Sequence, residues 1–178
     1  MNFNDLTIEF VKHCLEETMY SFNKFGEVKE FSAHNFDRFG VHRKMGNRNH
    51  TYIWEKFGVY WFFNKEECEK KANEYIQKLG IPVSKFKRVY NYISNYDSYT
   101  DDKPLYYKDK DGKIHESHLG DINTYEKDTQ KFVMAYEYDD DWGGGYVEEV
   151  YPISEYGKTW AIYKKDLEEK WYGKNWID

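Results

Sequence analysis

The chain has 178 residues, with 26 Lys and Arg, 32 Asp and Glu, and a formal net charge of -6 at pH 7. A chain of this length buries about 70% of its unfolded surface, so it needs no disulfide or metal to fold, and no apolar run reaches the roughly 18 residues that span a bilayer. The start, MNFNDLTIEF, lacks the basic and apolar regions of a signal peptide, and Cys14 and Cys68 lie at apolar positions of expected helices. We therefore expect a cytoplasmic protein without membrane contact.

Aromatic residues are unusually frequent, because the chain has 18 Tyr, 12 Phe and 6 Trp. A core of this size accommodates many Phe and Trp rings, but so many Tyr residues imply phenol rings at the surface, where they supply contact area at a small cost in side-chain entropy. This composition favours a binding surface. Mutational drift in an AT-rich genome, which enriches Tyr, Phe, Lys and Asn without selection for binding, is the alternative explanation.

The beginning of the chain is predicted to be an amphipathic helix over residues 3–24 that ends near Gly26. Its apolar residues recur at helical spacing, and they are Phe3, Leu6, Phe10, Cys14, Met19 and Phe22. Extended segments then follow at 28–33, 51–54 and 59–63. The turns between them are expected at Gly40, Gly46 and Gly58. This pattern predicts an antiparallel meander.

A second helix is predicted to begin after Asn64, whose side chain caps the first turn, with Glu67 three residues further on as in a capping box. Gly80 and the proline after it mark its end. A third helix is predicted over 84–96, and the basic residues of its first turn oppose the helix dipole at a cost of a few tenths of a kcal/mol. Because a purely structural helix gains nothing from that cost, we expect a binding partner to offset it.

The second half of the chain is predicted to consist mainly of hairpins. Its expected strands are 105–107, 113–115, 130–138, 146–151 and 158–163. The turn sequence Asp-Lys-Asp-Gly at 109–112 joins the first two strands. The last strand is expected to pair with an earlier strand and to lead into a short helix. The N-terminus of this helix is expected to be less stable than that of the second helix, because Tyr163 stands where the second helix has its Asn cap.

One pattern occurs twice, 99 positions apart, in FGVYWFFNKEECEKK at 57–71 and YGKTWAIYKKDLEEK at 156–170. In both copies a Gly turn leads into a short apolar run with Trp, and the period then lengthens from two residues to near 3.6, which predicts a strand followed directly by an amphipathic helix. Duplication or convergence on a common joint explains the match. We expect an α+β fold, a twisted antiparallel sheet with amphipathic helices and two repeated strand-to-helix units, as a single domain over 1–178 or as subdomains 1–82 and 83–178.

The charges are unevenly distributed. A basic set, interpreted as contacts to nucleic acid or phosphate, comprises Arg38, Arg43, Lys44, Arg48, Lys85, Lys87 and Arg88. An acidic set with one Trp, interpreted as a partner-binding hairpin tip, comprises Glu137, Asp139, Asp140, Asp141, Trp142, Glu148 and Glu149. Two patches of opposite sign suit electrostatic recognition better than solubility alone requires.

Several sequences resemble metal or phosphate motifs but depart from them. The 109–112 turn lacks both defining acidic ligands of a calcium loop, and His115 and His118 are one residue too close together for the HExxH zinc helix. The Gly run at 143–145 has acidic neighbours and lacks phosphate-loop spacing, so it is interpreted as a hairpin tip. We expect no metal and no cofactor.

Three histidines recur every eight residues among Asn and Arg side chains, at His34, His42 and His50. A metal-dependent nuclease needs a His base, acidic or His ligands, and a cation near the scissile phosphate. Only Asp37 supplies a carboxylate nearby. A solvated polar loop, a basic loop that contacts phosphate or an acidic protein surface, and a nuclease centre all remain open here.

The Gly-x-x-Trp-apolar-apolar-x-Lys-x-Glu/Asp run at 58–67 and 157–166 resembles the strand-to-helix segment of small phage and mobile-element proteins from low-GC Gram-positive bacteria. The likeness covers some 30 residues and carries no active site over. Among such proteins are the anti-CRISPR inhibitors, and the chain looks like that class in size, charge and aromatic content. The resemblance implies a compact, non-enzymatic protein that binds the nucleic-acid groove of a Cas nuclease in the host cytoplasm.

The leading functional expectation is therefore inhibition of a host defence protein or ribonucleoprotein, such as a Cas effector, by the acidic tip acting as a DNA mimic. The basic set would contact RNA or DNA in the same complex. The second hypothesis is a regulator that binds nucleic acid directly through the basic set. The third is the His-based metal-dependent nuclease. Since no nucleophile, base or metal motif is complete, we expect no enzymatic activity.

Overall fold

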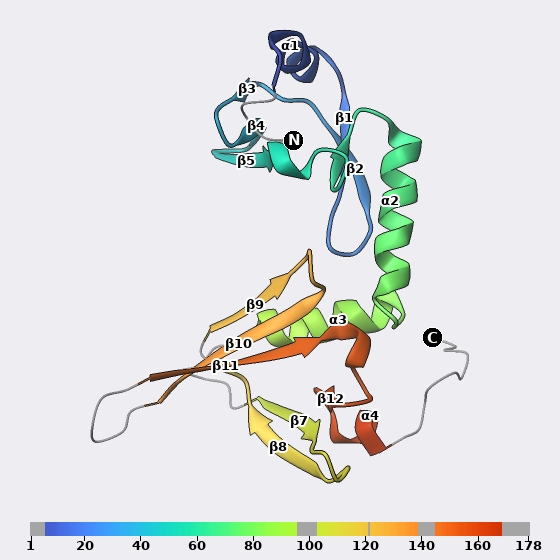
Figure 1. The fold of residues 1–178 in the computed structure, drawn as a ribbon, viewed down its shortest axis with the longest axis vertical. Coiled ribbons are helices and arrows are strands. Elements are labelled where there is room, and N and C mark those ends of the chain that lie inside the picture. The colour runs from blue at the N-terminus through green and yellow to red at the C-terminus, as the bar shows by residue number, and fades with distance from the viewer. Residues whose placement is uncertain (1–5, 96–102, 121, 139–144, 169–178) are drawn as a thin grey trace. The chain divides into compact units, whose positions relative to one another are not determined.

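The computed structural model describes residues 6–95, 103–120, 122–138 and 145–168. Helices and antiparallel strands both occur throughout these residues, which confirms the α+β class. The strands are distributed over four three-stranded sheets, and the chain divides into two compact units, unit 1 (Met1–Gln77) and unit 2 (Lys78–Asp178). Figure 1 labels the helices and strands of each unit.

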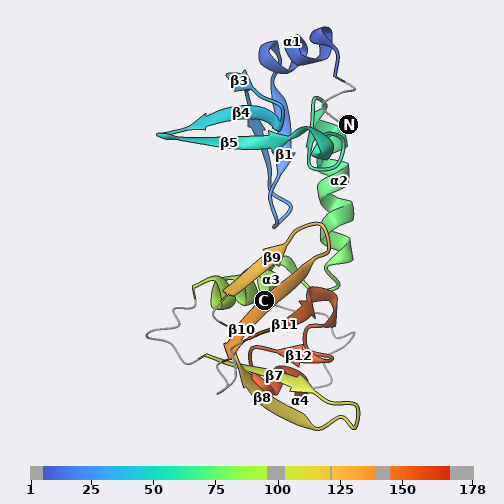
Figure 2. The same ribbon diagram turned by 60° about the vertical axis from the view of Figure 1, so that its left-hand side comes forward.

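Unit 1 contains two antiparallel sheets, with strand orders β2-β1-β6 and β3-β4-β5. In chain order its elements are α1 (Ile8–Glu16), β1 (Met19–Phe22), β2 (Val28–Phe31), β3 (Asn35–Phe36), β4 (Gly40–Met45), β5 (Arg48–Ile53), the 3-10 turn η2 (Trp54–Lys56), β6 (Trp61–Phe62) and α2 (Lys65–Lys78). The β4–β5 hairpin projects from the rest of the unit (Figure 2).

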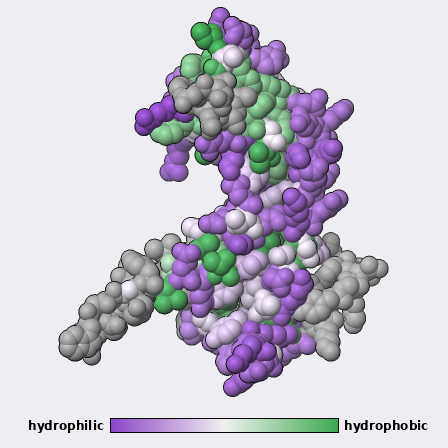
Figure 3. All heavy atoms as spheres, viewed as in Figure 1, coloured by the Kyte–Doolittle hydropathy of each residue, from purple (hydrophilic) through white to green (hydrophobic). Residues whose placement is uncertain are grey.

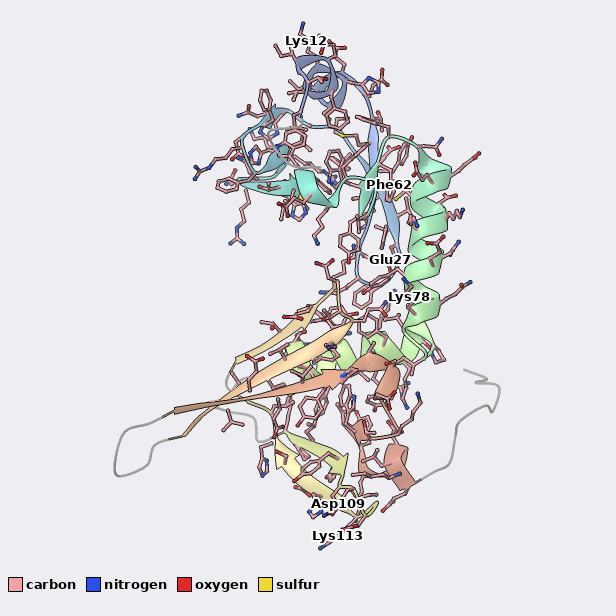
Figure 4. The ribbon with its side chains drawn as sticks, viewed as in Figure 1. Lys12, Glu27, Phe62, Lys78, Asp109 and Lys113 are labelled. Carbon is pink, nitrogen blue, oxygen red and sulfur yellow. The ribbon has the colours of Figure 1, made fainter. Side chains whose placement is uncertain are left out.

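The sheet β2-β1-β6 is covered on both faces, because successive side chains of a strand point to opposite sides. On one face Met19, Phe31 and Trp61 pack with Cys14 of α1 and Trp54. On the other, Phe22 and Phe62 pack with Cys68, Ala72 and Tyr75 of α2. Phe62 points toward α2 (Figure 4), and the outer face of that helix is hydrophilic (Figure 3). Unit 1 is therefore built in layers around this sheet.

Unit 2 has the sheets β12-β7-β8 and β11-β10-β9. In chain order its elements are α3 (Val83–Ser94), β7 (Pro104–Lys108), β8 (Ile114–His118), β9 (Ile122–Glu126), β10 (Lys131–Tyr138), β11 (Gly145–Pro152), the 3-10 turn η3 (Ile153–Glu155), β12 (Trp160–Ala161) and α4 (Lys164–Glu168). Phe86 of α3 packs against Tyr125 and Phe132, with ring centroids 5.0 and 6.4 Å apart, so α3 covers one face of β11-β10-β9.

The two units share one element order and one pattern of hydrogen bonds. Gly58 N donates to Trp61 O at 2.9 Å, and 99 residues later Gly157 N donates to Trp160 O at 2.6 Å. The indole Nε1 of Trp61 donates to Ile53 O at 2.9 Å, and that of Trp160 donates to Pro152 O at 2.7 Å. Both glycines have positive φ, 73° and 75°, which explains their identity. The repeated strand-to-helix unit is confirmed.

The correspondence extends beyond the repeated 15 residues. Trp61 pairs with Ser21 of β1, and Trp160 pairs with Tyr107 of β7, so the first hairpins of both units correspond. Equivalent positions there hold the same cross-strand pair, Tyr20 opposite Glu30 in unit 1 and Tyr106 opposite Glu116 in unit 2. Because the strand pairing agrees along whole units, duplication accounts for the repeat better than convergence of one joint.

The predicted helix over 3–24 is wrong beyond Glu16, since Met19–Phe22 is a strand. A spacing of three places Met19 and Phe22 on one side of a helix but on opposite faces of a strand, and here both faces are buried. Gly26 belongs to the hairpin turn after β1, with a φ of 76°, and does not end a helix. Residues 1–5, and residue 96 at the end of the predicted third helix, lie outside the described residues.

Gly40 is also not a turn residue, because it begins β4 opposite Ile53. A Cβ at this position would lie 2.1 Å from the carbonyl oxygen of Tyr52, so close approach of the two backbones requires glycine.

The predicted cap of the second helix is confirmed, since Glu67 N donates to Asn64 Oδ1 at 3.0 Å. At α4 the corresponding contact is Asp166 N to the backbone oxygen of Tyr163 at 3.0 Å. The hairpins predicted at 105–115 and 130–151 are confirmed as β7–β8 and β10–β11.

Candidate nucleic-acid interface

The β4–β5 hairpin carries most of the predicted basic set. Arg43 lies opposite His50, and Met45 lies opposite Arg48, so these four side chains share one face of the hairpin. Lys44, opposite Asn49, lies on the other face. Because the sequence from 38 to 50 contains four cations and no Asp or Glu, both faces of the projecting hairpin are positively charged.

Arg43 belongs to an exposed depression that the sequence did not reveal. Three cations from three elements line it, Lys29 of β2, Arg43 of β4 and Lys65 at the start of α2. The rest of its lining is Tyr20, Val28 and Glu30. We call this site the cationic depression. With three cations and one carboxylate, its lining is suited to an anion.

The ion pair of Lys65 with Glu69 leaves the charge of Lys65 largely available. Lys65 Nζ lies 3.7 Å from Glu69 Oε1 one helical turn further on, and both side chains are more than 45% exposed. An exposed pair of this kind contributes about 0.3–0.5 kcal/mol, so a phosphate can replace the carboxylate at little cost. Lys164 and Glu168 repeat the same pair at 3.7 Å in unit 2, but Lys164 is not among the residues that line the depression.

Exposed apolar side chains accompany the cations. Phe39 is 57% exposed, and the Arg38 guanidinium lies 4.6 Å from the centre of its ring. Met45 at the end of β4 is 53% exposed, and Phe36 of β3 is 40% exposed. Proteins that bind single-stranded nucleic acids combine aromatic rings with cations, because the bases stack on the rings while the cations contact the phosphates.

Asp37 fixes the loop between β3 and β4. Its Oδ1 accepts from Phe39 N at 2.7 Å and from Gly40 N at 3.1 Å, and its Oδ2 lies 3.2 Å from His42 Nε2. The pKa of Asp37 is lowered, mainly by the Phe39 backbone bond, with the Gly40 bond and His42 contributing. Its carboxylate therefore holds Arg38 and Phe39 beside the hairpin.

The three histidines of the nuclease hypothesis do not converge. His42 contacts Asp37 and, through Nδ1, Thr51 Oγ1 at 3.0 Å. His50 lies on the opposite face of the hairpin, with its ring 4.8 Å from that of Tyr52. His34 is exposed and donates its backbone N–H to His42 O. Within the described residues no group of three His, Cys, Asp or Glu side chains could hold a metal ion.

The 109–112 segment is a hairpin turn, as predicted. Asp109 Oδ1 accepts from Asp111 N and Lys113 N, both at 2.9 Å, and Oδ2 lies 2.7 Å from His115 Nε2 (Figure 4). The pKa of Asp109 is lowered, chiefly by the hydrogen bond with His115. The carboxylate is thus occupied within its own hairpin.

Lys85 does not belong to an exposed basic patch. It is buried in unit 2, with Nζ 3.0 Å from Asp166 Oδ2, and both residues are less than 10% exposed. The Tyr156 hydroxyl donates to the same carboxylate, and burial is the main cause that raises the pKa of this Tyr. The charge of Lys85 in the first turn of α3 is therefore offset by a carboxylate of this chain, not by the external partner that the sequence suggested. Lys87 is half-buried and Arg88 exposed on the same helix.

Part of the acidic set can be placed. In β11, Glu148 is exposed opposite Ala135, and Glu149 is half-buried opposite Met134 and accepts a hydrogen bond from the Tyr151 hydroxyl. Glu137 lies in β10. The remaining acidic-set members, Asp139, Asp140, Asp141 and Trp142, lie outside the described residues.

Comparisons with protein-family models, with curated proteins and with solved structures find no match for this chain. Among the helices that the structure describes, none combines the length and apolar character needed to cross a membrane.

Proposed function

We propose that this protein binds nucleic acid without catalysis, through the cationic depression and the β4–β5 hairpin of unit 1. The observation that supports this most is the meeting of Lys29, Arg43 and Lys65, which come from separate elements, around one exposed depression with a single carboxylate. A chain whose net charge is -6 has no need of such a cluster for solubility. Binding of a polyanionic ligand explains the cluster, because the ligand offsets the repulsion among the three cations.

The contacts divide into two kinds. Lys29, Arg43 and Lys65 in the depression, with Arg48 on the same face of the hairpin as Arg43, are suited to phosphates. The exposed ring of Phe39 is suited to stacking on an unpaired base. This combination favours single-stranded DNA or RNA over a duplex, whose bases are already stacked.

The test is fluorescence anisotropy with labelled single-stranded DNA, single-stranded RNA and duplex DNA at several salt concentrations. Arg43→Ala and Arg48→Ala should each weaken binding to all three, and Phe39→Ala should weaken only the single strands. Lys110→Ala, which removes an exposed cation at the β7–β8 turn of unit 2, is the control and should bind like wild type. Equal effects of Arg43→Ala and Lys110→Ala would refute the assignment of the site.

A second candidate is inhibition of a host defence nucleoprotein, such as a Cas nuclease, by the β10–β11 hairpin as a DNA mimic. Its support is the exposed carboxylate of Glu148 and the neighbouring Glu149 on a hairpin with eight-residue strands. Changing Asp139, Asp140 and Asp141 together to Asn should abolish inhibition of nucleic-acid cleavage while leaving binding to free nucleic acid unchanged. Retained inhibition would remove this candidate.

A further inference from the structure

The basic and acidic hairpins are structurally equivalent elements of the two units. Tyr52 of β5 and Tyr151 of β11 correspond through the 99-residue repeat, and their partners, Val41 and Phe132, are both buried. Counting outward from these pairs, Arg43 opposite His50 in unit 1 corresponds to Met134 opposite Glu149 in unit 2. This cross-strand pair therefore carries a positive charge on β4 in unit 1 and a negative charge on β11 in unit 2.

The next pair repeats the reversal, and the pair after it is charged only in unit 1. Lys44 opposite Asn49 corresponds to Ala135 opposite Glu148. Met45 opposite Arg48 corresponds to Tyr136 opposite Val147. Beyond the pairs Val41/Tyr52 and Phe132/Tyr151, the β4–β5 hairpin therefore carries only positive charge and the β10–β11 hairpin only negative charge. Two basic hairpins or two acidic hairpins repel each other, whereas a basic and an acidic hairpin attract.

β5, which carries Arg48, and β11, which carries Glu148 and Glu149, are edge strands of their described sheets, and Arg43 and Lys44 lie on β4, the strand next to β5. The strand orders are β3-β4-β5 and β11-β10-β9, which place β5 and β11 at one side. Ile53 on β5, and Val147 and Val150 on β11, are 45–48% exposed. An edge strand is a template for adding another strand, and proteins usually protect such edges with charges that prevent self-pairing. Charges of one sign prevent pairing of like edges but promote pairing of the unlike edges.

We propose that β5 of one copy of this protein pairs with β11 of a second copy, so that copies associate head to tail. The interface joins two different surfaces, and each copy keeps one basic and one acidic edge for a neighbour. Because adjacent residues of a strand point to opposite faces, one of the carboxylates of Glu148 and Glu149 lies on the face of Arg43 and Arg48 and takes the place of a phosphate there, while the other lies on the face of Lys44. Self-association and nucleic-acid binding therefore compete for the same cations.

The experiment measures sedimentation velocity of nuclease-treated, full-length protein over a concentration series at low and high salt. Wild type is expected to form larger species at low salt, which salt or a single-stranded oligonucleotide dissociates. The double variant Arg43→Glu/Arg48→Glu and the double variant Glu148→Lys/Glu149→Lys should each remain monomeric alone. An equimolar mixture of the two variants should associate again, because each then supplies the edge that the other lacks.

Restored association in the mixture also controls for folding, because two misfolded variants would not complement each other. The control Lys110→Glu should associate like wild type. Wild type that stays monomeric at every concentration in low salt, or a mixture that stays monomeric, overturns the proposal. The Glu148→Lys/Glu149→Lys variant should still bind oligonucleotide, so failure of self-association and failure of nucleic-acid binding are separate results.

Discussion

Replacing Lys85 with Met tests the internal role assigned to this cation. Lys85 and Asp166 form a buried pair 3.0 Å apart, with exposures of 8% and 7%. Removing the cation leaves the buried Asp166 carboxylate without its opposite charge, although the Tyr156 hydroxyl still donates to it, and costs about 3–5 kcal/mol. We expect the free energy of unfolding of unit 2 to fall by that amount. Urea denaturation monitored by circular dichroism measures this loss.

Unit 1 suggests the compensating change. Phe10 and Lys85 are both the third residue of their helix, and each lies over the equivalent ring, Phe57 at 5.1 Å and Tyr156 at 5.4 Å. The double variant Lys85→Phe/Asp166→Asn should therefore recover most of the loss, since it removes both buried charges, keeps the volume of the Asp166 side chain and leaves an acceptor for the Tyr156 hydroxyl.

Two comparisons decide the outcome. Lys164→Ala, which removes an exposed pair, should change the free energy of unfolding by no more than about 0.5 kcal/mol. A loss below about 1 kcal/mol for Lys85→Met would refute the claim that the buried Asp166 carboxylate depends on the charge of Lys85. A double variant as unstable as the single variant would refute the equivalence with Phe10.

Three further predictions concern unit 1. Asn64→Ala removes the side-chain acceptor for Glu67 N and should destabilise the protein by about 1 kcal/mol in urea denaturation, whereas Asn64→Ser should be nearly neutral. Gly40→Ala places a methyl group against Tyr52 O, so it should lower the melting temperature and abolish nucleic-acid binding, and unchanged binding would contradict the close approach. The lowered pKa of Asp37 means that its stabilisation is complete above its unfolded pKa of about 3.9 and is lost as pH falls through the lower folded value. The Asp37→Asn variant should lack this acid-dependent change when the hairpin is followed by NMR.

Local chemistry explains which parts of the fold could be predicted. The Asn64 cap, the 109–112 turn and the Gly turn before each Trp depend on residues within a few positions, and all are present in the structure. The error at Met19–Phe22 arose because a spacing of three fits one face of a helix and two buried faces of a strand equally well.

The candidate site could be predicted only in part, because it depends on pairing between distant segments. The hairpin cations, such as Arg43, were visible as a local excess of charge. Lys29 and Lys65 were not, since only the packing of β2, β4 and α2 brings them beside Arg43. Lys85 was assigned to the surface because its partner Asp166 lies far along the chain. Charge patterns thus predicted a basic surface, but not which cations form it.

The salt dependence of oligonucleotide binding by Lys65→Ala and Lys164→Ala tests the central claim most directly. These lysines occupy equivalent positions of the repeat, with matching exposures of 61% and 59% and matching carboxylate partners, but only Lys65 lines the cationic depression. For a single strand, loss of one phosphate contact reduces the slope of log affinity against log salt by about 0.7. We predict that reduction for Lys65→Ala and an unchanged slope for Lys164→Ala, and equal slopes for both variants would contradict the account.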